Sequence, residues 1–191
     1  LKVSSGEVVG FLGRNGCGKS TLLKVIFGSL KGQSQSVRLD GKYMSVAFKS
    51  GRIKFLPQEG LFPGFLSPEK AINLYNADAD TLIDIPEVRE YYKFRFDQMS
   101  GGIAKFIETL IVLHTPSDFV LLDEPFSYVA PVLVERLIPT IKVISKIRGV
   151  LMTDHQYQSI LSTSDRLYVL RDRSIYPVND VQQLHDMAYI K

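Results

Sequence analysis

The residues best suited to chemistry lie in the stretch "GRNGCGKST", which runs from Gly13 to Thr21 directly after the apolar segment "EVVGFL". The stretch fits the pattern G-x-x-x-x-G-K-[S/T], with a strand expected before it and a helix expected after it. Glycines allow backbone N–H groups to turn inward around an anion, and the N-terminus of the following helix adds a partial positive charge. The sequence therefore predicts a loop that binds the phosphates of a nucleotide.

The polar residues of this loop have predicted roles. Lys19 would reach the β- and γ-phosphates as a point charge, and Ser20 would offer its hydroxyl to Mg²⁺. A glycine-rich turn that matches the pattern by chance is the alternative, but the flanking strand and helix disfavour it. The residues predicted to bind the nucleotide are Asn15, Gly16, Cys17, Gly18, Lys19, Ser20 and Thr21.

Cys17 is the only cysteine of the chain, and it stands two residues before Lys19. A thiol at a helix N-terminus beside a lysine is favoured as the reactive thiolate, so one interpretation places it against the nucleotide. The other interpretation is a small residue that fits the loop and is inert because the loop covers it. A single cysteine also excludes an internal disulfide framework and fits a reducing compartment.

Acidic and polar residues stand at the ends of further apolar segments. In "FVLLDEP", four apolar residues precede Asp123 and Glu124, which places both at the carboxyl end of a predicted strand, where α/β sheets bind ligands. Asp123 would hold Mg²⁺ directly or through water, and Glu124 could polarise an attacking water as a general base. A solvated acidic turn is the alternative. Gln58 and His155 likewise end the strands "IKFLPQ" and "VLMTDH", although either residue alone is more typical of a turn or a surface.

The composition sets the broad class of the protein. The chain has 191 residues, of which 45% are hydrophobic and 23% charged, which suits one globular domain over residues 1–191. The formal charge of +3 is mild, so no nucleic-acid partner is expected. No apolar run approaches the roughly 20 residues that span a bilayer. The chain begins with Leu1 rather than methionine, so we expect a start that is cut, with part of an N-terminal β structure missing.

Strands and helices alternate along the chain, which predicts an α/β fold with a parallel sheet. The region from about residue 60 to 113 is rich in Pro, Tyr and charge and is predicted to form a small helical subdomain. A kink is expected at Pro139. The predicted strands are 8–12, 36–41, 53–58, 118–125, 149–155, 166–172 and 174–178, and the predicted helices are 19–27, 68–75, 86–92, 100–114, 131–147 and 181–190.

The order of "GRNGCGKST", "LPQ", "MSGG", "LLDEP" and "TDH" resembles the nucleotide-binding subunit of ABC (ATP-binding cassette) transporters over nearly the whole chain. The resemblance implies a P-loop NTPase (RecA-like) core, with the helical subdomain carrying the signature motif Ser100, Gly101 and Gly102. In that family the signature motif binds the γ-phosphate of ATP held by the opposite subunit. The resemblance also implies that Gln58 joins the Mg²⁺ site and senses the membrane partner, and that His155 is the switch histidine facing the γ-phosphate.

The family resemblance further implies an activity, cofactors and partners. We expect an ATPase that uses ATP and Mg²⁺, dimerises with a second ABC subunit as a homo- or heterodimer, and drives a separate transmembrane permease subunit. Such a subunit is cytoplasmic and peripheral on the inner face of the cell membrane. The region from Gln58 to Gln98 is the expected contact surface for the permease. The spelling of "DEPF" and "TDH" is similar to that in exporters of lipopolysaccharide and importers of branched-chain amino acids.

The sequence departs from the family pattern at several positions. Ile103 stands where Gln or Glu is usual, Ala130 stands where Asp is usual, and Lys105 is the only basic residue of "AKFIE", a segment usually rich in Arg and Lys. The aromatic residue that stacks on adenine normally lies upstream of Leu1. Two alternatives therefore stay open: a degenerate cassette that binds ATP as a conformational module with little turnover, and a soluble ABC ATPase without a transport function. Glu124 and His155 argue against the first, and the lack of a long coiled-coil insertion or a second cassette argues against the second.

Overall fold

The fold is given by a computed structural model, which describes residues 1–32, 36–178 and 183–184. Within these residues, six strands form one sheet in the order β4 (Ile53–Leu56), β5 (Phe119–Asp123), β6 (Gly149–Thr153), β1 (Val8–Leu12), β7 (Arg166–Arg171) and β8 (Ser174–Val178). Every neighbouring pair is parallel except β7 and β8. The predicted α/β fold with a parallel sheet is therefore confirmed.

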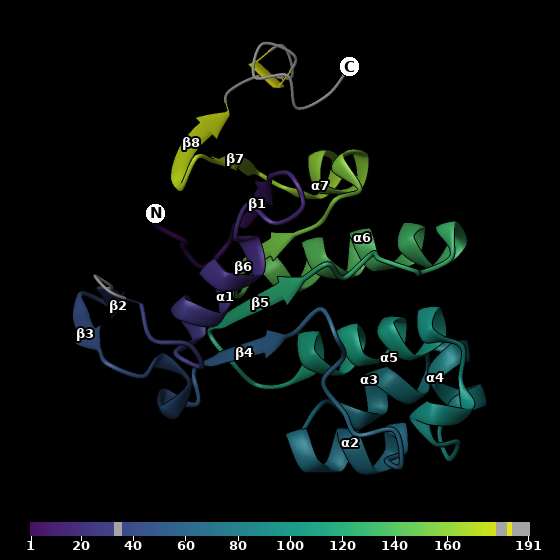
Figure 1. Ribbon diagram of the computed structural model, residues 1–191. Helices are drawn as coiled ribbons and strands as arrows, with labels where there is room; N and C mark the ends of the chain where they lie inside the picture. Colours follow the sequence, from purple (N-terminus) through teal and green to yellow (C-terminus); the bar gives the residue numbers. More distant parts are fainter. Residues whose placement is uncertain (33–35, 179–182, 185–191) are drawn as a thin grey trace.

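Helices cover both faces of the sheet because its central strands are apolar on both sides. Alternate side chains of β1 point to opposite faces: Val8 and Leu12 join the core beneath α5 (Gly101–His114) and α6 (Pro131–Ser145), whereas Val9 and Phe11 join the core beneath α1 (Lys19–Phe27). Figure 1 shows α1 on the side of the sheet opposite α5, α6 and α7 (Tyr157–Thr163). The resulting layers leave the carboxyl ends of the strands available for a site.

Short helices gather beside β4 at the edge of the sheet (Figure 1). They are α2 (Pro68–Tyr75), α3 (Ala79–Ile83), α4 (Pro86–Tyr91) and the 3₁₀ turn η2 (Phe96–Gln98), and α2, α3 and α4 each contact α5. Ser67 and Asp78 cap α2 and α3, and proline opens α2 and α4, as expected of helix N-termini. These helices form within the region predicted as a subdomain, and its boundaries stay a prediction.

Some elements differ from the sequence prediction. The predicted strand 36–41 forms as β2 (Val37–Leu39). Four other short elements were not predicted from the sequence: its partner strand β3 (Lys42–Met44), the 3₁₀ turn η1 (Ala47–Ser50), α3 and α7. The helix α6 continues through Pro139. The predicted closing helix 181–190 lies outside the described residues except at positions 183 and 184.

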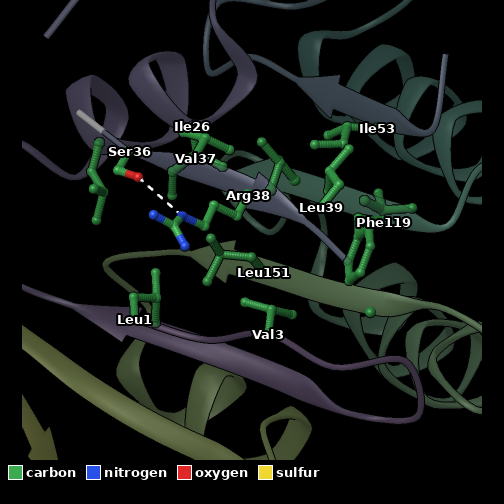
Figure 2. A pocket seen from close by; sticks show the side chains of 14 residues that line it. Leu1, Val3, Ile26, Ser36, Val37, Arg38, Leu39, Ile53, Phe119 and Leu151 are labelled. Carbon is green, nitrogen blue, oxygen red and sulfur yellow. Dashed lines mark hydrogen bonds between the residues drawn. The ribbon is translucent and has the colours of Figure 1, made fainter. Parts of the chain in front are cut away.

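An apolar cavity of about 260 Å³ lies between α1, the β2–β3 pair and the sheet (Figure 2). Phe119 and Gly149, which begin β5 and β6, belong to its wall. The cavity therefore lies at the amino ends of these strands, whereas the glycine-rich loop follows the carboxyl end of β1. This apolar cavity is thus separate from the predicted nucleotide site.

Candidate active site

The glycine-rich loop joins the end of β1 to the start of α1. Gly16 and Gly18 have φ angles of 78° and 107°, in the left-handed region where a side chain is strained. The Lys19 side chain is buried, and its ammonium donates hydrogen bonds to the carbonyl oxygens of Gly13 at 2.7 Å and Arg14 at 3.4 Å. The loop's own carbonyl groups therefore hold the lysine ammonium in place at the cavity wall.

A cavity of about 620 Å³ lies over this loop, within the size range of ligand sites in proteins. Its wall combines the loop with the carboxyl ends of β4, β5 and β6, so residues far apart in sequence meet there. The lining residues are Asn15, Gly16, Gly18, Lys19, Ser20, Thr21, Gln58, Glu124, Tyr128 and His155. The structure thus brings together nine of the predicted site residues and adds Tyr128, which the sequence did not indicate.

Cys17 does not contribute to this described cavity wall. Its half-buried side chain packs against the apolar cluster that contains Phe11, Leu23 and Leu170. A Cβ atom placed on Gly13 would lie 2.5 Å from the Cys17 Sγ atom, so the thiol fills the space beneath that glycine. The thiol therefore faces the core, and the structure favours the interpretation of Cys17 as a small, covered residue.

Asp123 is fully buried at the end of β5, where the strand register pairs it with Thr153 of β6. The Thr153 hydroxyl donates a hydrogen bond of 2.8 Å to Asp123 Oδ1. Asp123 Oδ2 has no hydrogen-bond partner among the described residues, although it is shielded from solvent. An unpartnered buried carboxylate oxygen is unfavourable unless a cation or its water shell meets it.

The oxygen donors in and beside the cavity wall suit Mg²⁺: Ser20 and Gln58 line the cavity, whereas Asp123 is buried at the end of β5 and is not among the described lining residues. A carboxylate from Asp123, a hydroxyl from Ser20 and an amide oxygen from Gln58 are all hard oxygen ligands. Among the described residues no group of three or more His, Cys, Asp or Glu residues could hold a metal ion. Mg²⁺ usually keeps several waters and is shared with the phosphates of a substrate, so few of its ligands need to come from the protein.

Glu124 is the centre of a hydrogen-bonded group in the cavity wall. Its Oε2 atom accepts hydrogen bonds from Gln58 Nε2 at 3.0 Å and from the Ser127 hydroxyl at 3.1 Å. The His155 Nδ1 atom lies 3.7 Å from the same oxygen and 3.3 Å from the Ser127 hydroxyl. Glu124 also has a φ angle of 53°, a strained conformation that such contacts must maintain. Three predicted residues, Gln58, Glu124 and His155, thus meet at one carboxylate.

Asp154 holds the loop that follows Glu124. The carboxylate is fully buried and accepts the backbone N–H groups of Phe126 and Gln156, both at 2.9 Å. Burial raises the pKa of Asp154, and these two N–H groups act in the opposite direction. Asp154 and Ser127 were not predicted as site residues, although Asp154 could have been noticed as the middle residue of "TDH".

The signature motif lies at the start of α5 and outside the described wall of the cavity. Ser100 caps the helix by accepting the Ile103 N–H at 3.3 Å. A Cβ atom on Gly102 would lie 2.3 Å from the Tyr128 carbonyl oxygen, so the glycine permits close packing against the loop after Glu124. Tyr128 has a φ angle of 64° and is 90% exposed. The signature motif therefore contacts the rim of the site through backbone atoms of Tyr128.

Comparison of the sequence with known proteins identifies the family of this chain. Residues 1–127 match the protein family described as "ABC transporter". This chain belongs to the ABC transporter family. It is 28% identical to the lipopolysaccharide export system ATP-binding protein LptB of Haemophilus influenzae, over all of this chain and 86% of that protein. It is also 28% identical to the high-affinity branched-chain amino acid transport ATP-binding protein BraG of Pseudomonas aeruginosa, over 92% of this chain and 82% of that protein.

Solved structures support the same fold. The ATP-binding subunit of an ABC transporter superposes with a TM-score of 0.81 at 18% identity, over 98% of this chain and 85% of that chain. A nucleotide-free ATP-binding cassette from an ABC transporter gives a TM-score of 0.81 at 20% identity, over all of this chain and 87% of that one. This ABC protein therefore has the P-loop NTPase fold. None of the helices in the described residues has the length and apolar character needed to cross a membrane.

Proposed function

We propose that this chain hydrolyses ATP with Mg²⁺ as a subunit of an ABC transporter. The observation that carries the proposal is the arrangement around Glu124: its carboxylate lies in the cavity wall, bound by Gln58 and Ser127, opposite the phosphate loop. A cassette that had lost hydrolysis would have no need to keep a strained glutamate with these partners. The degenerate alternative is therefore disfavoured.

The site residues divide the proposed reaction among them. The backbone N–H groups of the loop and the Lys19 ammonium bind the phosphates, with the ammonium moving from its present carbonyl partners to the nucleotide. Ser20, Gln58 and Asp123 would hold Mg²⁺, which neutralises charge that develops on the phosphates. Glu124 accepts the proton of the attacking water, and His155 orients the reacting groups.

The position of the signature motif supports the proposal of a dimer. Ser100, Gly101 and Gly102 form a helix N-terminus suited to an anion, yet they lie outside the described wall of their own chain's cavity. We infer that they close the ATP site of a second ABC subunit, identical or different. Each chain alone would then be a poor catalyst.

A groove beside Gln58 is the proposed contact for a transmembrane permease. Its volume is about 500 Å³, and it includes Pro57, Glu59 and Leu61 of the segment around Gln58. Leu74 is 67% exposed and Phe48 is 40% exposed at its edge, so apolar surface is available to a partner. The contact surface predicted over residues 58–98 is thereby enlarged, because the groove also includes residues of α1 and η1. With a permease bound there, the chain would be peripheral on the inner face of the membrane.

The curated relatives serve different cargoes. Two relatives of equal identity are named for different transport systems, one for lipopolysaccharide export and one for branched-chain amino acids. The proposed role of an ATPase subunit applies equally to an importer and to an exporter.

Glu124→Gln tests the proposed general base. Glutamine keeps the shape and can still contact Gln58 and Ser127, but it cannot accept a proton from water. We expect ATP hydrolysis to fall about a hundredfold or more, while ATP binding is retained and an ATP-bound dimer accumulates. Steady-state phosphate release and size-exclusion chromatography with Mg-ATP measure both effects. Glu135→Gln, at an exposed position of α6, is the matched control. Wild-type turnover in Glu124→Gln would exclude Glu124 as the base.

A further inference from the structure

Two charged residues of α5 are buried beside the ATP site and are not among the groups that bind phosphate, Mg²⁺ or the attacking water in the proposed reaction. Lys105 is 7% exposed and Glu108 is 4% exposed. They are three positions apart on the helix, so both project from the same face. Lysine and glutamate are almost never buried to this extent unless polar partners surround them. Their partners therefore indicate what the two residues do.

Lys105 links α5 to the ends of two neighbouring strands. Its ammonium donates hydrogen bonds to the carbonyl oxygens of Pro57 at 2.9 Å and Gln58 at 3.0 Å, just past β4, and lies 3.5 Å from that of Asp123, at the end of β5. These contacts use all three hydrogens of the ammonium. Burial lowers the pKa of Lys105, and the nearby carboxylate of Glu108 acts in the opposite direction.

Glu108 holds the segment immediately after Gln58. Its Oε1 atom accepts the backbone N–H groups of Leu61 at 3.1 Å and Phe62 at 3.0 Å. A Cβ atom on Gly60, where φ is 98°, would lie 3.3 Å from the other carboxylate oxygen. The chain thus wraps closely around the carboxylate. Burial raises the pKa of Glu108, and the N–H groups of Phe62 and Leu61 act in the opposite direction.

Lys105 and Glu108 thus fix the two sides of one short turn. Lysine binds the backbone before and at Gln58, and glutamate binds the backbone three and four residues later. Between these anchors, the Gln58 side chain reaches 3.0 Å from Glu124. Because the backbone position of Gln58 decides where its amide lies, displacement of either anchor would move that amide away from the carboxylate.

We propose that Lys105 and Glu108 are positioning residues for the ATPase reaction, which act by fixing residues 57–62 and thereby the Gln58 side chain on Glu124. This proposal assigns a function to Lys105, the single basic residue of "AKFIE". The inference rests on the proposed ATPase function and deepens it. It also connects the signature helix with the turn that borders the proposed permease groove, since Pro57 and Leu61 line that groove.

A double-mutant cycle separates positioning from general stabilisation. Methionine keeps most of the length of Lys105 without the ammonium. We expect Lys105→Met to lower kcat about tenfold or more, with KM and the Kd for ATP changed less than about twofold. In a Gln58→Ala background the same substitution should lower kcat less than about twofold, because Lys105 acts through Gln58. Equal losses in both backgrounds would overturn the proposal. Lys142→Met, on the exposed face of α6, is the control and should retain wild-type kcat.

Hydrogen exchange tests Glu108 without reference to activity. In Glu108→Met the N–H groups of Leu61 and Phe62 lose their acceptor, so exchange of peptides covering residues 57–62 should accelerate about tenfold or more. Glu108→Gln keeps an acceptor oxygen and should restore slow exchange and most of the kcat. Unchanged exchange in Glu108→Met would overturn the proposal.

Two further variants distinguish a failure to fold from a loss of activity. Should Lys105→Met fail to fold, Glu108→Met replaces it in the cycle with Gln58→Ala. Failure of even Glu108→Gln to fold would overturn the positioning role in favour of a purely structural one. If the unsubstituted chain does not hydrolyse ATP with Mg²⁺ while exchange responds as expected, the ATPase assignment fails and the anchoring of residues 57–62 stands.

Discussion

The phosphate loop and the signature motif are both glycine-containing helix N-termini, but among the described residues only the phosphate loop lines a cavity of its own chain. Both place glycines at the N-terminus of a helix, α1 in one case and α5 in the other. The phosphate loop adds a buried lysine and lines a cavity of its own chain. The signature motif has no cation in its first turn, begins at an exposed serine, and packs a glycine against the Tyr128 backbone.

This contrast shows that an anion-binding helix end is not by itself a complete site. The phosphate loop combines N–H groups, a cation and a cavity, so one chain supplies what a nucleotide needs. The signature motif supplies N–H groups and a hydroxyl but is not among the described residues that line its own chain's cavity, which is the basis of our proposal that it binds ATP held by a second subunit. The two regions should therefore respond differently to substitution, and three predictions test the difference.

The largest effect is expected in the phosphate loop. Lys19→Ala removes the buried ammonium and should lower ATP affinity about tenfold to a hundredfold, roughly 1.4–2.7 kcal/mol, because a charge-assisted contact to phosphate is lost. Titration with a fluorescent ATP analogue measures the loss. Ser100→Ala in the signature motif should leave the affinity of the monomer unchanged. An unaltered affinity in Lys19→Ala would remove the phosphate-loop assignment and with it the contrast.

The next effect concerns the packing of the signature glycines. Gly102→Ala would place a methyl group 2.3 Å from the Tyr128 carbonyl oxygen, so backbone must move. We expect the free energy of unfolding to fall by about 1–2 kcal/mol. Gly101→Ala is the matched control, because a methyl group there meets nothing within 4 Å. Urea denaturation compares the two variants, and equal stability would show that the close approach to Tyr128 is relaxed in solution.

The smallest effect concerns helix capping. Ser100 caps α5, whereas α6 begins after Ala130, which has no polar side chain to accept an N–H group. Ala130 has φ and ψ angles of −61° and 142°, the backbone conformation of an N-cap residue. Ala130→Asp should therefore raise the free energy of unfolding by about 0.5–1 kcal/mol, measured by thermal and urea denaturation. Ala130→Val, which cannot cap, should give no gain, and a gain of equal size in both variants would exclude capping as the cause.

The sequence predicted much of the site because its strongest signals are local. The phosphate loop, the strand before it and the helix after it lie within twenty residues, and α1 has the predicted bounds of Lys19 and Phe27. Asp123 and Glu124 follow a run of four apolar residues, a length that is typical of a buried strand. The short elements α3, α7 and β3 were missed because five to seven residues, or three in β3, carry too little periodicity to predict.

The sequence by itself determined the chemistry: a glycine-rich loop with one lysine, an acidic pair after a buried strand, and a glutamine and a histidine at two further strand ends. Only the tertiary structure decided which of these groups meet. Gln58 and Glu124 are 66 positions apart and bond because β4 and β5 are neighbours, and Thr153 reaches Asp123 because β5 and β6 pair in that register. It also turned the Cys17 thiol toward the core and buried Lys105 and Glu108. Local pattern fixes which donors and acceptors a chain carries, whereas the packing of distant segments fixes their partners, since a hydrogen bond depends on a few tenths of an ångström.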